Sequence, residues 1–566
     1  MNESPSTSGA PRLPTITRFT SWLFSRSLLG CALVGLAALT TLIALVATEE
    51  TWRGKRAWER YKHELEAQGE KLDWKDYIPP PVPDAQNFAM TPFLAPLFDF
   101  YPEPRQEGQS RWRDTNGFSR ANSLGLKYPP LLTAEYRPDR SWRQMTDLPA
   151  WAAALTNNAV AAAAENAAQE AFLRRYGVRR PSGAPEPTSA VAEPTVPVLA
   201  LTRGEAATEV LRALAKYNPI LEELRRASQR PYVRFNVHYD DEFAPAILLP
   251  QLAVMKNAAI LFQLRACAEL ELGQSDQAWS DTRMALYLAD TVKDEPFLIS
   301  KLVQVAIDQL ALQPIWEGLA EHKWSDAQLT EIEQRLGKLD LLVDSALRGE
   351  RALGIRRIEQ TRSLGIINPE TSGRLPRVLT LLLRGAFYQN ELSLTRMYQQ
   401  LYVPVVDAAT QRIYPSRATA NEAALTSALA HGFRPYNLFA RMLLPAITRA
   451  ETKFAFGQTR VNLAIVACAL ERFRVAQGQF PESLEPLSPR FLSKSPHDII
   501  TGAPLIYRRT QDGQFILYSV GWNEKDDGGT VVMTQAKQPS ADITQGDWIW
   551  QYSAPAVSHV HSAARQ

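Results

Sequence analysis

The sequence predicts a mainly α-helical protein with one N-terminal transmembrane helix and a small C-terminal α+β head. Three observations lead to this prediction. The run from Leu28 to Ala47 carries no charge, apolar residues recur at helical spacing from Glu205 to about Gln400, and two short runs rich in β-branched and aromatic residues follow Gly502. With 566 residues the chain is long enough for two or three domains.

The uncharged run, residues 28–47, would be about 30 Å long as a helix, which is enough to cross the hydrocarbon core of a bilayer. A cleaved signal peptide is the alternative, but the run is longer than a typical signal-peptide core and ends in a poor cleavage site, Leu45-Val46-Ala47. The tail, residues 1–27, carries three arginines against one acid. We therefore expect a single pass through the cell (inner) membrane, with the tail in the cytoplasm and the bulk of the chain periplasmic or otherwise extracytoplasmic.

Composition restricts the partners and the redox chemistry. The formal net charge is +2, so nothing favours a nucleic-acid partner. The three cysteines, Cys31, Cys267 and Cys468, all lie in apolar stretches, which is typical of buried thiols rather than of a disulfide framework.

Residues 51–180 connect the membrane run to the rest of the chain. Thr51 to Lys75 have the pattern of a charged, amphipathic helix that continues from the membrane, with Trp52 and Trp58 near the headgroups. The Pro- and aromatic-rich stretch 84–147 is either an extended segment packed on another part of the chain or a partly disordered linker. An alanine-rich helix is predicted for residues 150–176, and a Pro/Ala/Ser/Thr linker for residues 181–197.

Residues 205–445 are predicted to form a helical domain. Its clearest helices are expected at residues 246–272, 277–291, 297–319, 325–342 and 345–364. Ser275-Asp276 is a predicted N-cap, and Ser325 with Gln328 has the spacing of a capping box.

Residues 262–286 resemble a tetratricopeptide-type hairpin. Ala266, Gly273, Ala278 and Ala285 fall where the two helices of that repeat cross closely and need small residues. Asp290 stands where the repeat has proline, and a generic αα-hairpin is the alternative.

The predicted head spans residues 446–552. It begins with a long helix, residues 446–477, that is expected to end at Gly478. Two strand-like runs, 502–508 and 515–521, flank Asp512-Gly513, and this pattern predicts a β-hairpin with a primed turn. Residues 553–566 are expected to form a disordered tail.

This order of elements resembles the head of the type II secretion major pseudopilins. That family ends its long helix in a Tyr/Phe-Arg…Asn/Gln-Gly-x-Tyr/Phe-Pro phrase, which here is Phe473-Arg474…Gln477-Gly478-Gln479-Phe480-Pro481. Its Pro-x-Asp-Pro-x-Gly-x-Pro-Tyr and Tyr-Ser-x-Gly phrases are matched by Pro496-His497-Asp498…Gly502-Ala503-Pro504-Leu505 and Tyr518-Ser519-Val520-Gly521. The resemblance covers about 105 of the 566 residues. The membrane run lies some 400 residues upstream and lacks the pseudopilin processing phrase, so we do not expect this chain to polymerise into a pilus.

In the pseudopilins the loop after the Tyr-Ser-x-Gly phrase binds calcium, and the resemblance implies a structural calcium ion here. The corresponding loop offers the oxygen ligands that calcium prefers, from Asn523, Glu524, Asp526 and Asp527, and Asp542 or Asp547 could close the site. The spacing is not that of an EF-hand, and a solvated acidic turn is the alternative.

Two other charged clusters are expected to be structural. His238 to Glu242 is predicted to be a polar loop, because one histidine and three adjacent carboxylates on an extended segment cannot all face one point. The charges between Glu350 and Arg362 lie at helical spacings and are expected to pair on the surface.

No motif for nucleotide binding, nucleophilic catalysis or zinc binding is present in the sequence. The chain as a whole resembles bacterial envelope proteins of unassigned function. We therefore expect a membrane-anchored, non-enzymatic envelope protein that binds a protein partner or assists assembly, and a link to a type II secretion or pilus-like system is the more specific hypothesis. The alternative is an envelope hydrolase whose site is assembled from residues distant in sequence.

Overall fold

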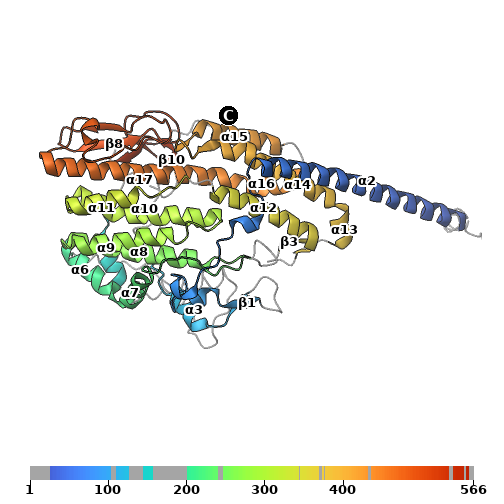
Figure 1. The fold of residues 1–566 in the computed structure, drawn as a ribbon, viewed down its shortest axis with the longest axis horizontal. Helices are drawn as coiled ribbons and strands as arrows, with labels where there is room; N and C mark the ends of the chain where they lie inside the picture. The colour runs from blue at the N-terminus through green and yellow to red at the C-terminus, as the bar shows by residue number, and fades with distance from the viewer. Residues whose placement is uncertain are drawn as a thin grey trace, which may run out of the picture.

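The computed structural model describes residues 26–102, 110–126, 144–156, 201–239, 247–342, 345–368, 373–374, 376–430, 435–534, 540–552 and 556–559. The fold is mainly helical, as predicted. Figure 1 shows one long helix projecting from a body of helices that lie side by side, with short strands covering the body near its opposite end.

The projecting helix is α2, Arg26–Ala67, which is apolar in its first half and charged in its second half. Its apolar part is long and apolar enough to cross a membrane, and none of that part is buried against the body. The helix predicted to continue to Lys75 stops at Ala67, where Gly69 adopts a φ of +86°, and a 3-10 turn, η1 (Trp74–Tyr77), follows. Most of the predicted tail, residues 1–25, lies outside the described residues.

The charged half of α2 packs along α14, Arg384–Met397. Trp58 and Leu65 of α2 form an apolar cluster with Tyr388 and Leu392 of α14. Trp52 is 61% exposed, but Trp58 is only 4% exposed. The prediction that Trp58 lies near the headgroups is therefore wrong, because packing against α14 makes it a core residue.

The described part of the Pro- and aromatic-rich stretch packs on the helical body. Phe88, Phe93, Phe98 and Trp112 are each at most 4% exposed, so of the two alternatives the packed segment is the correct one for these residues. The stretch contains η2 (Asp84–Gln86), η3 (Ala95–Phe98), β1 (Phe100–Pro102), β2 (Ser110–Trp112) and α3 (Thr115–Asn122). α4 (Leu148–Thr156) is the start of the predicted alanine-rich helix, whose remainder lies, with the linker 181–197, outside the described residues.

The helices predicted between residues 246 and 364 are confirmed. The elements of this region are α6 (Arg203–Leu214), η5 (Ala215–Tyr217), α7 (Asn218–Ala227), α8 (Pro250–Glu271), α9 (Ser275–Asp290), α10 (Leu298–Ala320), α11 (Asp326–Leu336) and α12 (Ser345–Leu364). α8 and α9 form the predicted hairpin, and Gly273, with a φ of +73°, ends α8.

The two predicted N-caps differ in outcome. Ser325 and Gln328 form the capping box, with each side chain bonded to the other residue's backbone N–H. Ser275 is not an N-cap, because Gln274 occupies the cap position. The Ser275 hydroxyl instead accepts a hydrogen bond from Gln328, which draws it away from the end of its own helix.

Between α12 and the last long helix the chain forms short elements close to the point where α2 leaves the body (Figure 1). They are β3 (Ile366–Asn368), β4 (Gly373–Arg374), α13 (Arg377–Leu382), α14, the π-helix η7 (Tyr398–Tyr402), η8 (Val403–Val405), β5 (Val406–Asp407), β6 (Arg412–Ile413), α15 (Pro415–Ala430), η9 (Pro435–Asn437) and α16 (Leu438–Leu443).

The long helix predicted at residues 446–477 is α17, Pro445–Gln477, and it ends at Gly478 in the left-handed conformation, with a φ of +79°. After η10 (Glu485–Leu487) the chain forms two small sheets. One sheet has the order β11-β8-β7, and the other has the order β10-β9-β12. Their strands are β7 (Ile506–Arg509), β8 (Phe515–Ser519), β9 (Thr530–Met533), β10 (Ala541–Gly546), β11 (Trp548–Trp550) and β12 (Ala556–His559).

Two details of this region correct the sequence prediction. β7 and β8 form the predicted hairpin, but its turn is not primed, because a type I′ turn needs positive φ at both central residues and here only Gly513 has it. The loop runs from Thr510 to Gln514 and is longer than the two-residue loop of a primed turn. In it Asp512 does not need a positive φ, and its carboxylate accepts a hydrogen bond from the Gln514 N–H at 3.2 Å. Residues 556–559, expected to belong to a disordered tail, form β12, which pairs in parallel with β9.

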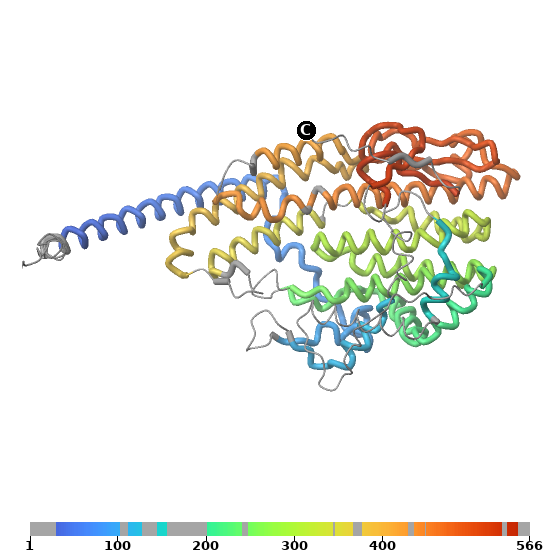
Figure 2. Tube along the Cα trace, turned by 180° about the vertical axis from the view of Figure 1, so that it is seen from behind, coloured from blue at the N-terminus to red at the C-terminus, as the bar shows by residue number. Residues whose placement is uncertain are grey.

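One hydrophobic core runs through the helical body and continues under the strands. It includes Leu310 of α10, Leu329 of α11, Leu463 of α17 and Leu517 of β8, each at most 2% exposed. The core is continuous because α17 lies between the strands and the other helices of the body, as Figure 2 shows. The helices before residue 445 and the predicted head therefore share their core.

Candidate functional site

The predicted calcium loop is held by the carboxylate of Asp547. This side chain lies between β10 and β11, is 1% exposed, and accepts hydrogen bonds from the backbone N–H groups of Asp527 (3.2 Å), Gly529 (2.6 Å) and Thr530 (3.2 Å). Burial raises the pKa of Asp547 to about 6 despite these three bonds. Through these three hydrogen bonds Asp547 holds the predicted calcium loop against the strands β10 and β11.

The other predicted ligands also have hydrogen-bond partners within the protein, and one pair of them bond to each other. Asn523 donates to the Asp527 carboxylate at 2.8 Å, and Tyr518 donates its hydroxyl to the Asp526 carboxylate at 3.0 Å. Glu524 instead accepts from Ser416 of α15 at 3.4 Å. Asp542 accepts from Thr544 and does not join the loop.

The structure therefore joins the Asp547 carboxylate to the backbone of the loop that carries Asn523, Glu524, Asp526 and Asp527. The Glu524 and Asp542 carboxylates bond elsewhere, to Ser416 and Thr544. Among the residues that the structure describes, no group of three or more His, Cys, Asp or Glu side chains is placed to hold a metal ion. Calcium binding would require these carboxylates to move closer together around the ion, and it stays a prediction.

The two clusters expected to be structural have different outcomes. Of residues 238–242 only His238 and Tyr239 are described, and the His238 ring stacks on Phe100 at 4.3 Å. The charged residues of α12 do not form the expected surface, because Arg351 is 0% exposed and Glu350 accepts from the Leu298 N–H at 3.1 Å. Helical spacing showed that these charges share faces, but not that another part of the chain covers those faces.

Arg351 fixes the segment that follows α2 to α12. Its guanidinium donates to Glu70 at 2.7 Å, to Gln399 at 2.8 Å and to the backbone oxygen of Lys71 at 3.0 Å. Arg348 also pairs with Glu70. Burial opposes ionisation of Glu70, but the hydrogen bonds from the two arginines outweigh it and lower the pKa of Glu70 below its ordinary value.

A cleft of about 300 Å³ opens beside these contacts, where the end of α2 and η1 meet α12. We call it the anchor cleft; its charged and aromatic lining consists of Trp58, Lys62, Asp73, Lys75, Arg356 and Glu359, together with Trp74. The lining thus holds three basic and two acidic side chains, together with the indole rings of Trp58 and Trp74, which are largely buried. Such a lining suits a side chain or small group that is partly apolar and carries negative charge.

Arg356 is the best-fixed charge in the anchor cleft. It donates to the backbone oxygen of Tyr239 at 2.5 Å and lies over the Trp74 ring at 5.9 Å. Burial raises the pKa of Glu359, while nearby Arg362 and Lys62 lower it. Lys62, in contrast, pairs with Glu66 of its own helix at 3.8 Å, and its side chain is 39% exposed.

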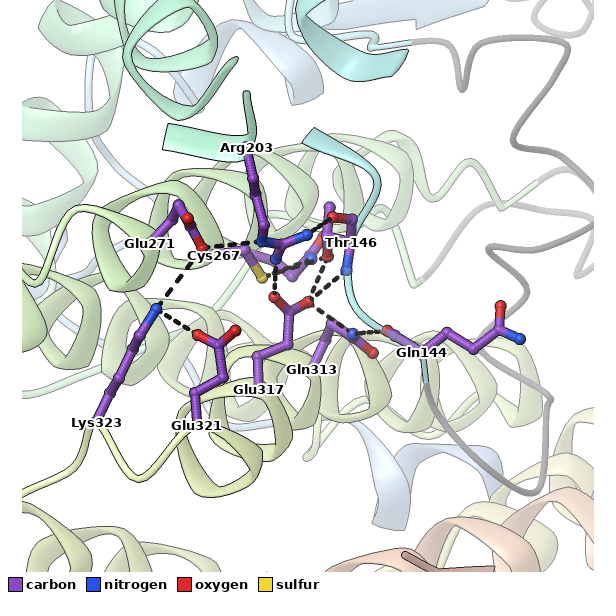
Figure 3. A network of polar contacts seen from close by, with 10 residues as sticks. Gln144, Thr146, Arg203, Cys267, Glu271, Gln313, Glu317, Glu321 and Lys323 are labelled. Carbon is purple, nitrogen blue, oxygen red and sulfur yellow. Dashed lines mark hydrogen bonds and ion pairs between the residues drawn. The ribbon is translucent and has the colours of Figure 1, made fainter. Parts of the chain in front are cut away.

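A second polar site joins residues that are far apart in sequence (Figure 3). Glu317 of α10 accepts from the Thr146 N–H at 2.9 Å, from the Thr146 hydroxyl at 2.6 Å and from Gln313 at 2.8 Å through one oxygen. Its other oxygen pairs with Arg203 of α6 at 2.9 Å. Arg203 also reaches Glu271 of α8 at 2.9 Å, which extends the network to Lys323.

Cys267 contributes the one thiol among the residues that Figure 3 labels, and its environment keeps that thiol protonated. Its sulfur lies 3.5 Å from the Thr146 hydroxyl. Burial raises the pKa of the Cys267 thiol well above its ordinary value, and the charge of Glu317 raises it further. A thiol must ionise to attack, so this network is better suited to fixing residues 144–148 and α6 onto α8 and α10 than to covalent catalysis.

No family model, curated protein or solved structure matches the chain. The resemblances of residues 446–552 to pseudopilin heads and of residues 262–286 to a tetratricopeptide hairpin therefore stay predictions. The geometry of the chain's own residues has to support any functional conclusion.

Sequence reasoning missed the buried acids of the body. Asp308 of α10 is 0% exposed and Glu451 of α17 is 1% exposed, and neither carboxylate has a hydrogen-bond partner among the residues that the structure describes. Burial raises the pKa of Asp308 to about 8 and the pKa of Glu451 well above its ordinary value. The signal that could have found Asp308 is its place within an apolar stretch of α10, Val305-Ala306-Ile307-Asp308-Gln309-Leu310.

Proposed function

We propose that this chain is a non-enzymatic envelope protein, anchored in the cell membrane by α2, whose extracytoplasmic body docks a protein partner. The observation that carries the proposal is that the anchor is part of the fold. α2 passes without a break from its membrane-length apolar half into the body, where it lies along α14, and just after its end Glu70 pairs with the buried Arg351. A body fixed in this way is held at a set distance and orientation from the membrane, which is useful for positioning a partner.

The anchor cleft is the proposed docking point. It lies at the junction of anchor and body, and its cations Lys62, Lys75 and Arg356 favour an acidic segment on the partner. Its two indole rings add apolar area, which is typical of residues that dominate binding energies. A link to a type II secretion or pilus-like system is the more specific proposal, and only the resemblance of residues 446–552 supports it.

The test places a photo-activated crosslinking residue at Lys75, in the cleft, and separately at the exposed Lys216, on η5, in the full chain within its native membranes. We expect light-dependent adducts of higher mass at Lys75 that are absent at Lys216. The Lys62→Glu change should remove the Lys75 adducts because it reverses a cleft charge, whereas Lys216→Glu should not. Docking in this cleft would be contradicted if the Lys75 adducts persisted in the Lys62→Glu variant, or if adducts formed equally at Lys75 and Lys216.

The alternative, an envelope hydrolase, is favoured by one observation, which is the network that assembles Thr146, Arg203, Cys267 and Glu317 from distant parts of the chain. Glu317→Gln separates the two proposals. If the network is structural, the variant loses thermal stability because Arg203 is left with Glu271 as its one carboxylate partner in the network. Hydrolysis of ester or peptide substrates by the purified full chain, abolished in a Glu317→Gln variant that stays folded, would instead favour the hydrolase.

A further inference from the structure

A short apolar surface lies beside the point where α2 leaves the body. In α13 and the residue after it, Val378 is 69% exposed, Leu379 39%, Leu381 63% and Leu383 36%. Outside α2, this is the densest run of exposed large apolar side chains in the part of the chain that the structure describes. Exposed arginines, Arg377 and Arg384, flank the run on both sides.

The position of α13 relative to the membrane follows from its neighbour on α14. A Cβ atom on Gly385 would come within 2.6 Å of the backbone carbon of Glu50, so the start of α14 touches α2 at that residue. Glu50 lies three residues beyond Ala47, where the predicted span ends, and this is about 5 Å along a helix axis. α13 immediately precedes this contact and itself contacts α2.

The direction of α13 suits a helix at a membrane surface. The chain turns at Leu383, which caps α13 with a φ of −89° and a ψ of 3° before α14 begins. Figures 1 and 2 show α13 at the end of the body from which α2 projects, running across the direction of α2 instead of continuing α14. Because α2 would cross the bilayer, a helix that runs across it at this level lies close to the membrane plane.

We propose that α13 is a second membrane contact, inserted in the interface of the bilayer beside α2. The apolar side chains at 378, 379, 381 and 383 enter the boundary between headgroups and acyl chains, and Arg377 and Arg384 contact lipid phosphates. Continuity with the span favours lipid as the occupant. A second copy of the chain fits less well, because four side chains supply little of the roughly 800 Å² per partner that a stable interface needs.

This inference rests on the proposed anchoring by α2, and the experiment separates the two. Single cysteines replace Leu381, Leu39 of the span and Val475, an equally exposed apolar residue of α17, in a full chain that also carries Cys31→Ser. Each cysteine receives a nitroxide spin label, and the chain is reconstituted in vesicles of phosphatidylcholine and phosphatidylglycerol. Power saturation then compares collisions of the label with oxygen, which concentrates in the bilayer, and with a water-soluble nickel chelate.

We expect the labels at residues 381 and 39 to favour oxygen, with residue 381 at the shallower depth, and the label at residue 475 to favour the nickel chelate. A label at residue 381 that is as accessible to nickel as the label at residue 475 overturns the α13 contact alone. Spin–spin broadening at residue 381 without a preference for oxygen overturns it in favour of a second copy. A water-accessible label at residue 39 overturns the anchor, and the α13 contact with it.

Discussion

At the scale of single residues, Asp308 should make the stability of this protein depend on pH. Burial raises the pKa of Asp308 from 3.8 to about 8, so between these values the folded chain holds a proton that the unfolded chain has released. The stabilisation that this proton contributes is therefore largest below about pH 4 and is lost as pH rises towards 8, by about 1.4 kcal/mol per pH unit. Asp308→Asn removes this proton and, with it, the part of the pH dependence that Asp308 contributes.

The measurement is thermal unfolding of the full chain in detergent micelles at a series of pH values. The stability of the Asp308→Asn variant, relative to that of the unsubstituted chain, should increase steadily between about pH 5 and pH 7. Above about pH 9 the difference should be constant, because Asp308 is then ionised in both the folded and the unfolded chain. If the difference between the two proteins is constant from pH 5 to pH 7, Asp308 is not protonated in the folded chain.

The loop around Asp547 makes the second prediction at this scale. If calcium binds, the carboxylates of Asp526, Asp527 and Asp547 move closer together around the ion, and the melting temperature should rise by several degrees relative to protein in chelator. Asp526→Ala combined with Asp527→Ala should abolish the rise. Asp542→Asn is the matched control, because Asp542 bonds to Thr544 outside the loop and should leave the rise intact. An unchanged melting temperature in millimolar calcium would exclude the site.

Sequence alone could predict part of this residue-level picture. The resemblance associated Asp547 with the loop that carries Asp526 and Asp527, and in the structure the Asp547 carboxylate accepts hydrogen bonds from the backbone of that loop. The sequence could not pair Arg351 with Glu70, or Glu317 with Arg203, because these partners lie more than a hundred residues apart and no local pattern relates them. Helical spacing tells which charges share a face, but the element that covers that face is set by the tertiary fold.

At the scale of elements, the crossing of α2 and α14 depends on two glycines. A Cβ atom on Gly54 would lie 2.9 Å from the backbone oxygen of Gly385, and a Cβ atom on Gly385 would lie 2.6 Å from the backbone carbon of Glu50. The neighbouring atoms are backbone and cannot rotate away. Gly385→Ala should therefore force the helices apart and cost about 1–3 kcal/mol of stability, although alanine favours a helix.

Gly35→Ala is the control for this crossing. Gly35 lies in the exposed apolar half of the same helix, and nothing lies within 4 Å of a Cβ atom built there. Thermal unfolding of the two variants in the same detergent should show a lower melting temperature for Gly385→Ala only. Equal melting temperatures would mean that α2 does not pack on α14 as closely as the structure has it.

The elements themselves were largely predictable, and their ends less so. Apolar periodicity placed α8, α9, α10, α12 and α17, because a helix that buries one face must repeat its apolar residues every three or four positions. α2 ends earlier than its amphipathic pattern predicts because Gly69 turns the chain, and Ser275 fails as a cap because Gln328 binds its hydroxyl. Both deviations come from contacts or conformations that periodicity does not encode.

At the scale of the whole molecule, the sequence divides the chain at residue 445, whereas the hydrophobic core does not stop there. The apolar pattern changes after α17 because short strands replace helices, and this change predicted a separate head. In the structure α17 packs on α10 and α11, and Trp316 of α10 donates to the backbone oxygen of Gln551 at 3.1 Å, beside the strands. A sequence pattern detects a change of secondary structure, but it does not report whether the two parts are buried against each other.

This shared core predicts that the chain after α2 unfolds as one cooperative unit. A chain that ends at Leu444 lacks α17, so Leu310 and Leu329, both at most 2% exposed in the full chain, lose an apolar neighbour and face water. The truncated chain should lack a cooperative transition, and calorimetry of the full chain should show a single one. Two transitions in the full chain, or a truncated chain that melts cooperatively near the same temperature, would mean that the head is an independent domain after all.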